Sequence, residues 1–89
     1  MKTLYKFNWS TRDGEVAGIF VKDSAEVDAA IGRPVGFGEI LGKHSDVNGQ
    51  LDLEDLTVLS SDPAFIEQFE KIVGEVGYNP LDFMGKDSQ

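Results

Sequence analysis

The chain has no cysteine and no long apolar run, and each of these absences excludes a class of function. Without cysteine, disulfides and thiolate metal centres are excluded. No apolar stretch approaches the ~18 residues of a membrane-spanning helix, so we expect no membrane partner. Residues 1–6 lack the apolar core and cleavage site of a signal peptide, which makes a cytoplasmic location the simplest expectation.

Positive charge is also scarce, and the shortage is confined to one half of the chain. The formal net charge is -8. Up to Lys43, six bases match six acids, whereas from His44 onward two bases face ten acids. A surface of this charge repels nucleic acid and anionic lipid and attracts basic proteins. The same acidity also favours solubility without any further role.

The remaining composition is that of one small folded domain. The chain has 89 residues, 40% of them apolar, with six Phe, two Tyr and one Trp. This apolar content is too high for a disordered chain, and the length allows one hydrophobic core. We therefore expect a single domain over residues 1–89.

A β-hairpin is predicted at the amino terminus, where residues 5–9 alternate between aromatic and polar side chains. A two-residue loop would place Trp9 opposite Gly18, and a three-residue loop would place it opposite Ala17. The second register gathers apolar residues on one face, so we prefer it. It leaves Val16 and Phe20 on the other face of the sheet.

Residues 23–31 have the pattern of a short helix. Asp23 can cap its first turn, Glu26 lies three residues further on, and Gly32 provides a stop just before Pro34.

Three further strands are predicted in the middle of the chain. Residues 35–41 form the first of them, and a type I turn at residues 46–49 leads into the second. In this hairpin Leu51 and Leu53 face the core. Residues 56–60 form the last strand.

The clearest helix begins at Asp62, a capping residue, followed by Pro63 at the first helical position. Gly74 or Gly77 ends it. Its apolar stripe comprises Phe65, Ile66, Phe69, Ile72, Val73 and Val76. The predicted order is β-β-α-β-β-β-α, which indicates an α+β fold: a small, mostly antiparallel sheet with the helices packed on one face.

Residues 44–55 partly match the calcium loop of an EF-hand. His44 stands where the first Asp ligand belongs, and Asp55 replaces the bidentate Glu. A β-hairpin accounts for the same residues, and the helices that flank a calcium loop are not predicted. Divalent-metal binding is nevertheless an alternative function, with His44, Asp46, Asp52 and Asp55 as candidate ligands. No cofactor is predicted.

Two segments resemble small uncharacterised acidic α+β proteins of bacteria and their phages. They are residues 37–46 (FGEILGKHSD) and 77–81 (GYNPL). The resemblance implies no specific activity. Bacterial and phage genomes often encode small acidic inhibitors of host nucleases or polymerases, and these inhibitors are a loose analogy for this chain.

No catalytic motif is present, so we expect a non-enzymatic, acidic protein-binding module. Its partner would be a basic protein surface, and the module would act as an inhibitor or a nucleic-acid mimic. A structural, homo-oligomeric subunit is a second alternative; we expect a monomer or a weak homodimer. The candidate partner-binding residues are Asp46, Asp52, Glu54, Asp55, Glu67 and Glu70.

Overall fold

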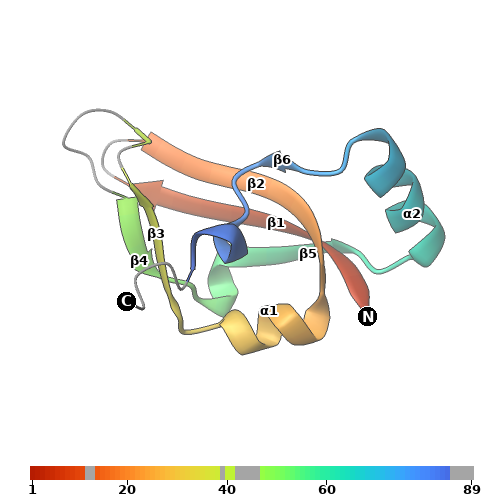
Figure 1. The fold of residues 1–89 in the computed structure, drawn as a ribbon, viewed down its shortest axis with the longest axis horizontal. Coiled ribbons are helices and arrows are strands. Elements are labelled where there is room, and N and C mark those ends of the chain that lie inside the picture. Colours follow the sequence, from red (N-terminus) through yellow and green to blue (C-terminus); the bar gives the residue numbers. More distant parts are fainter. Residues whose placement is uncertain (12–13, 39, 42–46, 85–89) are drawn as a thin grey trace.

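The computed structural model describes residues 1–11, 14–38, 40–41 and 47–84 (Figure 1). The strands are β1 (Lys2–Thr11), β2 (Gly14–Asp23), β3 (Pro34–Gly38), β4 (Val47–Gln50), β5 (Leu56–Ser60) and β6 (Val76–Gly77). The helices are α1 (Ser24–Ala30), after β2, and α2 (Pro63–Ile72), after β5. Two 3₁₀ turns, η1 (Leu53–Asp55) and η2 (Pro80–Phe83), precede β5 and follow β6.

The strands form two antiparallel sheets. The larger has the order β5-β1-β2-β6, and β3 pairs with β4 in the smaller one. The α+β class with antiparallel sheets is therefore confirmed. The predicted element order is wrong in one respect, because it ended at α2 and omitted β6. That strand has only two residues, too few to produce an alternating pattern.

The register of the first hairpin differs from both alternatives considered above. Trp9 lies opposite Val16, rather than Ala17 or Gly18. Val16 and Phe20 were expected on the other sheet face, but they are fully buried in the aromatic core. In the observed register Gly18, rather than a larger residue, lies on this aromatic face.

Glycine is required there because the chain after β6 passes very close to β2. Gly18 lies opposite Gly77. A Cβ on Gly18 would overlap the carbonyl oxygen of Tyr78 and lie 2.6 Å from its nitrogen. A Cβ on Gly77 would in turn overlap the carbonyl oxygen of Ala17, and Gly77 has a φ of 74°. This close approach favours the observed register over the alternatives.

The second hairpin also differs from the prediction. Val47–Gln50 was expected to contain the turn, but it forms β4 and pairs with β3. The strand predicted at residues 35–41 ends at Gly38, where φ is 81°. Leu51 is buried as expected, whereas Leu53 lies in η1 and is 67% exposed. Burial of Val47, an apolar residue in the predicted turn, favours the strand.

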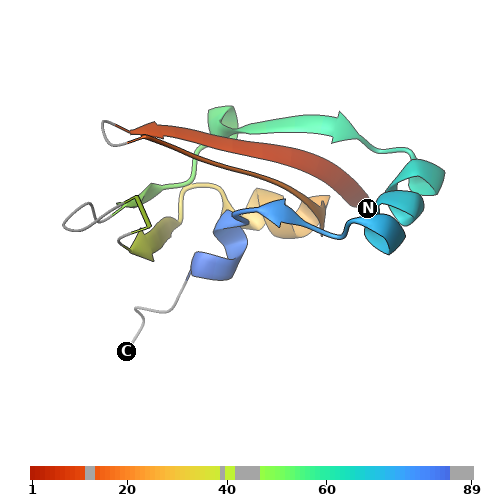
Figure 2. The ribbon, with the colours of Figure 1, turned by 90° about the horizontal axis from the view of Figure 1, so that it is seen from above.

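Both predicted helix starts are confirmed. The Asp23 side chain accepts a hydrogen bond from Ala25 N, and Asp62 accepts one from Ala64 N. α1 packs on the aromatic core through Val27. α2 lies beside the start of β1 at the end of the sheet (Figures 1 and 2). The prediction that the helices pack on one face of the sheet is therefore wrong for α2. Only two residues separate β5 from α2, too few to carry the helix back across the sheet.

Candidate functional site

Five of the six candidate partner-binding residues lie in one continuous stretch, from Asp52 to Lys71. This stretch comprises η1, β5 and α2, and it holds six acids and one base. The sixth candidate, Asp46, lies outside the described residues. The six acids fall on either side of β5, which has no charged side chain between Leu56 and Ser60.

Asp55 fixes the start of β5 to the first hairpin. Its Oδ2 accepts a hydrogen bond from Trp9 Nε1 at 2.8 Å and another from the Asp52 backbone at 2.9 Å. The Asp55 backbone donates to the Asp52 carbonyl at 3.0 Å, which closes the 3₁₀ turn. Because the carboxylate is half-buried and already accepts two hydrogen bonds, it contributes to the fold before any partner arrives.

Asp52 precedes this turn and Glu54 lies within it, and both are exposed. Glu54 forms no ion pair or hydrogen bond with another residue that the structure describes. An exposed carboxylate of this kind keeps its water shell and presents its charge to an approaching molecule. At this end of β5, Glu54 is therefore the group available to a partner, with the exposed Asp52, which accepts from the Asp55 backbone, beside it.

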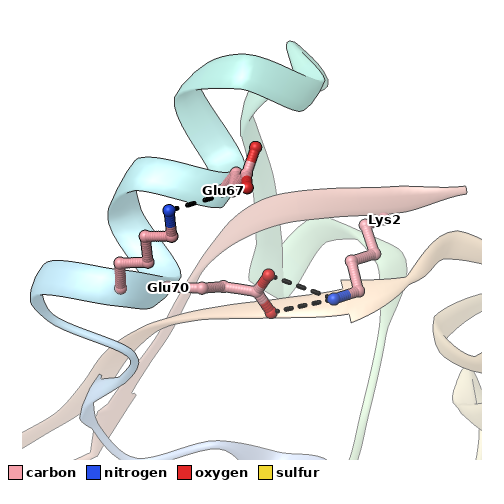
Figure 3. A network of polar contacts seen from close by, with 4 residues as sticks. Lys2, Glu67 and Glu70 are labelled. Atoms are coloured by element: carbon pink, nitrogen blue, oxygen red, sulfur yellow. Dashed lines mark hydrogen bonds and ion pairs between the residues drawn. The ribbon is translucent and has the colours of Figure 1, made fainter.

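Glu67 and Glu70 lie on α2 at the other end of β5 (Figure 3). Both oxygens of Glu70 accept from Lys2 Nζ, at 3.0 and 3.2 Å. Glu67 lies 3.8 Å from Lys71, one turn further along the helix. All four side chains are more than a third exposed, so each pair stabilises the fold by about 0–1 kcal/mol and can exchange partners at little cost.

A pocket of about 230 Å³ lies between the start of β1 and α2, next to Ser61, the residue that follows β5. Apolar and acidic groups face it together. It is lined by Met1, Lys2, Ser61, Pro63, Ile66, Glu67 and Glu70. This combination suits a side chain with an aliphatic stem and a cationic end, as in lysine or arginine.

The candidate metal ligands are only partly described. His44 and Asp46 lie outside the described residues, while Asp52 and Asp55 are joined through the 3₁₀ turn. Among the residues that are described, no group of three or more His, Asp or Glu side chains is placed to hold a metal ion. Strand β4 lies within the candidate calcium loop at residues 44–55, and strand β5 follows the loop directly, where an EF-hand would require a helix.

Among the described residues, the two ionisable groups with clearly shifted pKa values lie outside this stretch. The backbone N–H of Ala25 and the terminal ammonium of Met1 lower the pKa of Asp23 from 3.8. Burial raises the pKa of the Tyr5 phenol, and the nearby carboxylate of Asp28 raises it further. These shifts have structural causes, a helix cap and a buried ring, and they do not mark the acidic stretch.

Two features of the stretch were missed from the sequence. Val58 and Leu59, in the strand predicted at residues 56–60, are 58% and 45% exposed, and this exposure was not predicted from the sequence. Lys2 lies 68 positions from its partner Glu70, so no local pattern joins them. The sequence feature that could have indicated this arrangement is the uncharged run at residues 56–60, which lies between two acidic segments.

Comparison with known proteins adds no relative: no family model, curated protein or solved structure matches the chain. Neither helix of the described chain has the length and apolar character to cross a bilayer.

Proposed function

We propose that the chain is a non-enzymatic protein-binding module whose acidic second half binds a basic protein surface. The observation that supports this most directly is the arrangement around β5. Exposed acids flank an exposed, uncharged strand at both of its ends, within a stretch of net charge -5. A basic surface would meet negative charge at two places and apolar side chains between them.

Complementary charge accelerates encounter and selects partners more than it increases affinity. The exposed apolar residues between the acids would supply the part of the affinity that salt does not screen. A nucleic-acid mimic that inhibits a DNA- or RNA-binding protein is the sharpest form of this proposal, because such proteins have clustered Lys and Arg side chains.

The experiment compares two double variants that change the net charge equally. Glu54→Gln with Glu67→Gln neutralises one acid on each side of β5. Glu15→Gln with Glu26→Gln does so in the electrically neutral half. The control is closely matched, because Glu26 forms an (i, i+4) pair with Lys22 just as Glu67 does with Lys71.

Each variant and the parent chain would be immobilised and exposed to a bacterial lysate, and bound proteins would be quantified by mass spectrometry at two salt concentrations. We expect a basic protein that binds the parent and the control, is lost from the β5-flanking variant, and is weakened by salt. Equal capture by both variants, or capture of no protein by the parent, would contradict the proposal.

A further inference from the structure

The outer edge of β5 is the feature from which more can be inferred. β5 ends the order β5-β1-β2-β6 and pairs only with β1 among the described strands. Thr57, Val58 and Leu59 are all exposed. The strand has neither charge nor proline between Leu56 and Ser60. Such an edge presents backbone donors and acceptors to any further extended chain.

The opposite edge of the sheet lacks this property. β6 has two residues and leads at once into the chain that packs on Gly18. Short edge strands offer few pairing groups, which is one way in which proteins protect them. β5 has a partial safeguard of its own, since the register shift between Leu4 and Tyr5 leaves Leu59 unmatched. The regular part of the free edge is therefore Leu56–Val58.

We propose that the basic partner binds as an added β-strand along β5, with apolar or β-branched residues in its middle and Lys or Arg at both ends. This inference rests on the proposed function and specifies its binding mode. The five residues of β5 span roughly 16 Å at about 3.3 Å each. In the chain, Asp52 and Glu54 precede this span, and Glu67 and Glu70 follow it on α2 (Figure 3).

Charge complementarity selects this occupant over an uncharged or acidic strand. A strand with basic ends separated by about five positions would meet both acidic groups at once. At the α2 end, the pocket beside Lys2 and Pro63 would hold the aliphatic stem of a lysine or arginine. Its cationic end would reach Glu67 and Glu70 there, joining or displacing Lys2.

The test uses two synthetic peptides of equal charge. The first has two lysines at each end and four alternating valines and threonines between them. The second is identical except that its four central amides are N-methylated, which removes the donors needed for strand pairing. Binding would be measured by NMR on the ¹⁵N-labelled chain, together with amide hydrogen exchange of residues 56–60.

We expect the unmethylated peptide to bind at least about tenfold more tightly and to slow exchange in β5, because it adds backbone hydrogen bonds along Leu56–Val58. Equal binding without protection of β5 would overturn the strand addition while leaving the cationic attraction of the proposed function in place. Binding of neither peptide would overturn both. Protection of β5 in a dimer without peptide would assign the edge to a second copy and overturn this inference.

Two variants with the same charge change locate the contact. Val58→Lys places a cation on the free edge, and Ile72→Lys places one on α2, where the side chain is 77% exposed. Both wild-type residues are exposed, so we expect both variants to fold. Val58→Lys should remove the preference for the unmethylated peptide, whereas Ile72→Lys should retain it. Equal effects would place the contact away from β5.

Discussion

Replacing Asp55 by alanine should destabilise the protein far more than replacing its neighbour Glu54. The Asp55 carboxylate accepts two hydrogen bonds, from the Trp9 indole and the Asp52 backbone. Hydrogen bonds to a charged acceptor contribute about 1.5–3 kcal/mol each when buried. Because this carboxylate is only half-buried, we take about 2–3 kcal/mol for the two together. Glu54→Ala removes an equal charge and should stay within about 0.5 kcal/mol.

The effect should be easy to measure in a domain of this size. Small domains lose roughly 4–8 °C in melting temperature per kcal/mol, so Asp55→Ala should melt about 10–20 °C lower than the parent. Far-UV circular dichroism would follow the melting. Trp9 is the single tryptophan, so the fluorescence of the folded state reports on its indole separately. We expect a changed emission in Asp55→Ala and an unchanged one in Glu54→Ala.

Asp55→Asn provides an intermediate case, because an amide oxygen still accepts hydrogen bonds but has no charge. Its melting temperature should lie between those of the parent and Asp55→Ala. If Asp55→Ala and Glu54→Ala melted within about 2 °C of each other and shared one emission spectrum, the indole–carboxylate bond would not exist in solution. Asp55 would then be a surface acid like Glu54, and our assignment of it to the fold would be wrong.

Three further predictions concern the fold and its charge. Gly18→Ala should lose about 1–3 kcal/mol in urea unfolding, because its Cβ overlaps Tyr78, whereas Gly36→Ala, with open space around it, should be near neutral; equal losses would contradict the close approach. Because its pKa is lowered, the Asp23 carboxylate stabilises the fold above pH ~4, and this stabilisation is lost as the pH falls through the lowered pKa. Asp23→Asn should therefore reduce the dependence of the free energy of unfolding on pH in the acid range, and an unchanged dependence would refute this. Sedimentation should show a monomer at about 0.15 M salt and self-association near 1 M, where charges are screened; a monomer at both would argue against an adhesive edge.

The elements predicted correctly depend on short-range chemistry. Asp23 and Asp62 each cap a helix within two residues of their own position, and Gly32 and Gly74 lie just beyond the helix ends with φ of 90° and 86°. Signals of this kind are complete within a few consecutive residues. The strand at residues 56–60 was likewise visible as an uncharged, β-branched run.

The registers were not predictable because they depend on distant residues. The first hairpin places Gly18 where Tyr78 crosses it, 60 positions later in the chain, and no pattern within the hairpin contains that information. In the second hairpin, the turn signal at residues 46–49 competed with burial of Val47, and burial prevailed. Local turn propensity is weaker than the gain from covering an apolar side chain.

The candidate site was predicted as a composition, and the structure differentiates its members. Counting acids identified the stretch from Asp52 to Lys71 but treated all of its carboxylates alike. Asp55 differs from Glu54 because of Trp9, which is 46 positions away. Glu67 and Glu70 differ from each other because Lys2 reaches only the second of them. Each distinction requires a contact between residues far apart in the sequence.

The position of the acids also explains why an exposed apolar edge need not cause self-association. Two copies of β5 pairing antiparallel would bring Asp52 and Glu54 of one chain against Glu67 and Glu70 of the other. Like charges placed opposite each other destabilise such a pair, and charged flanks are a common protection of edge strands. The same flanks attract a strand with basic ends. One distribution of charge therefore disfavours a second copy and favours a basic partner at the same edge.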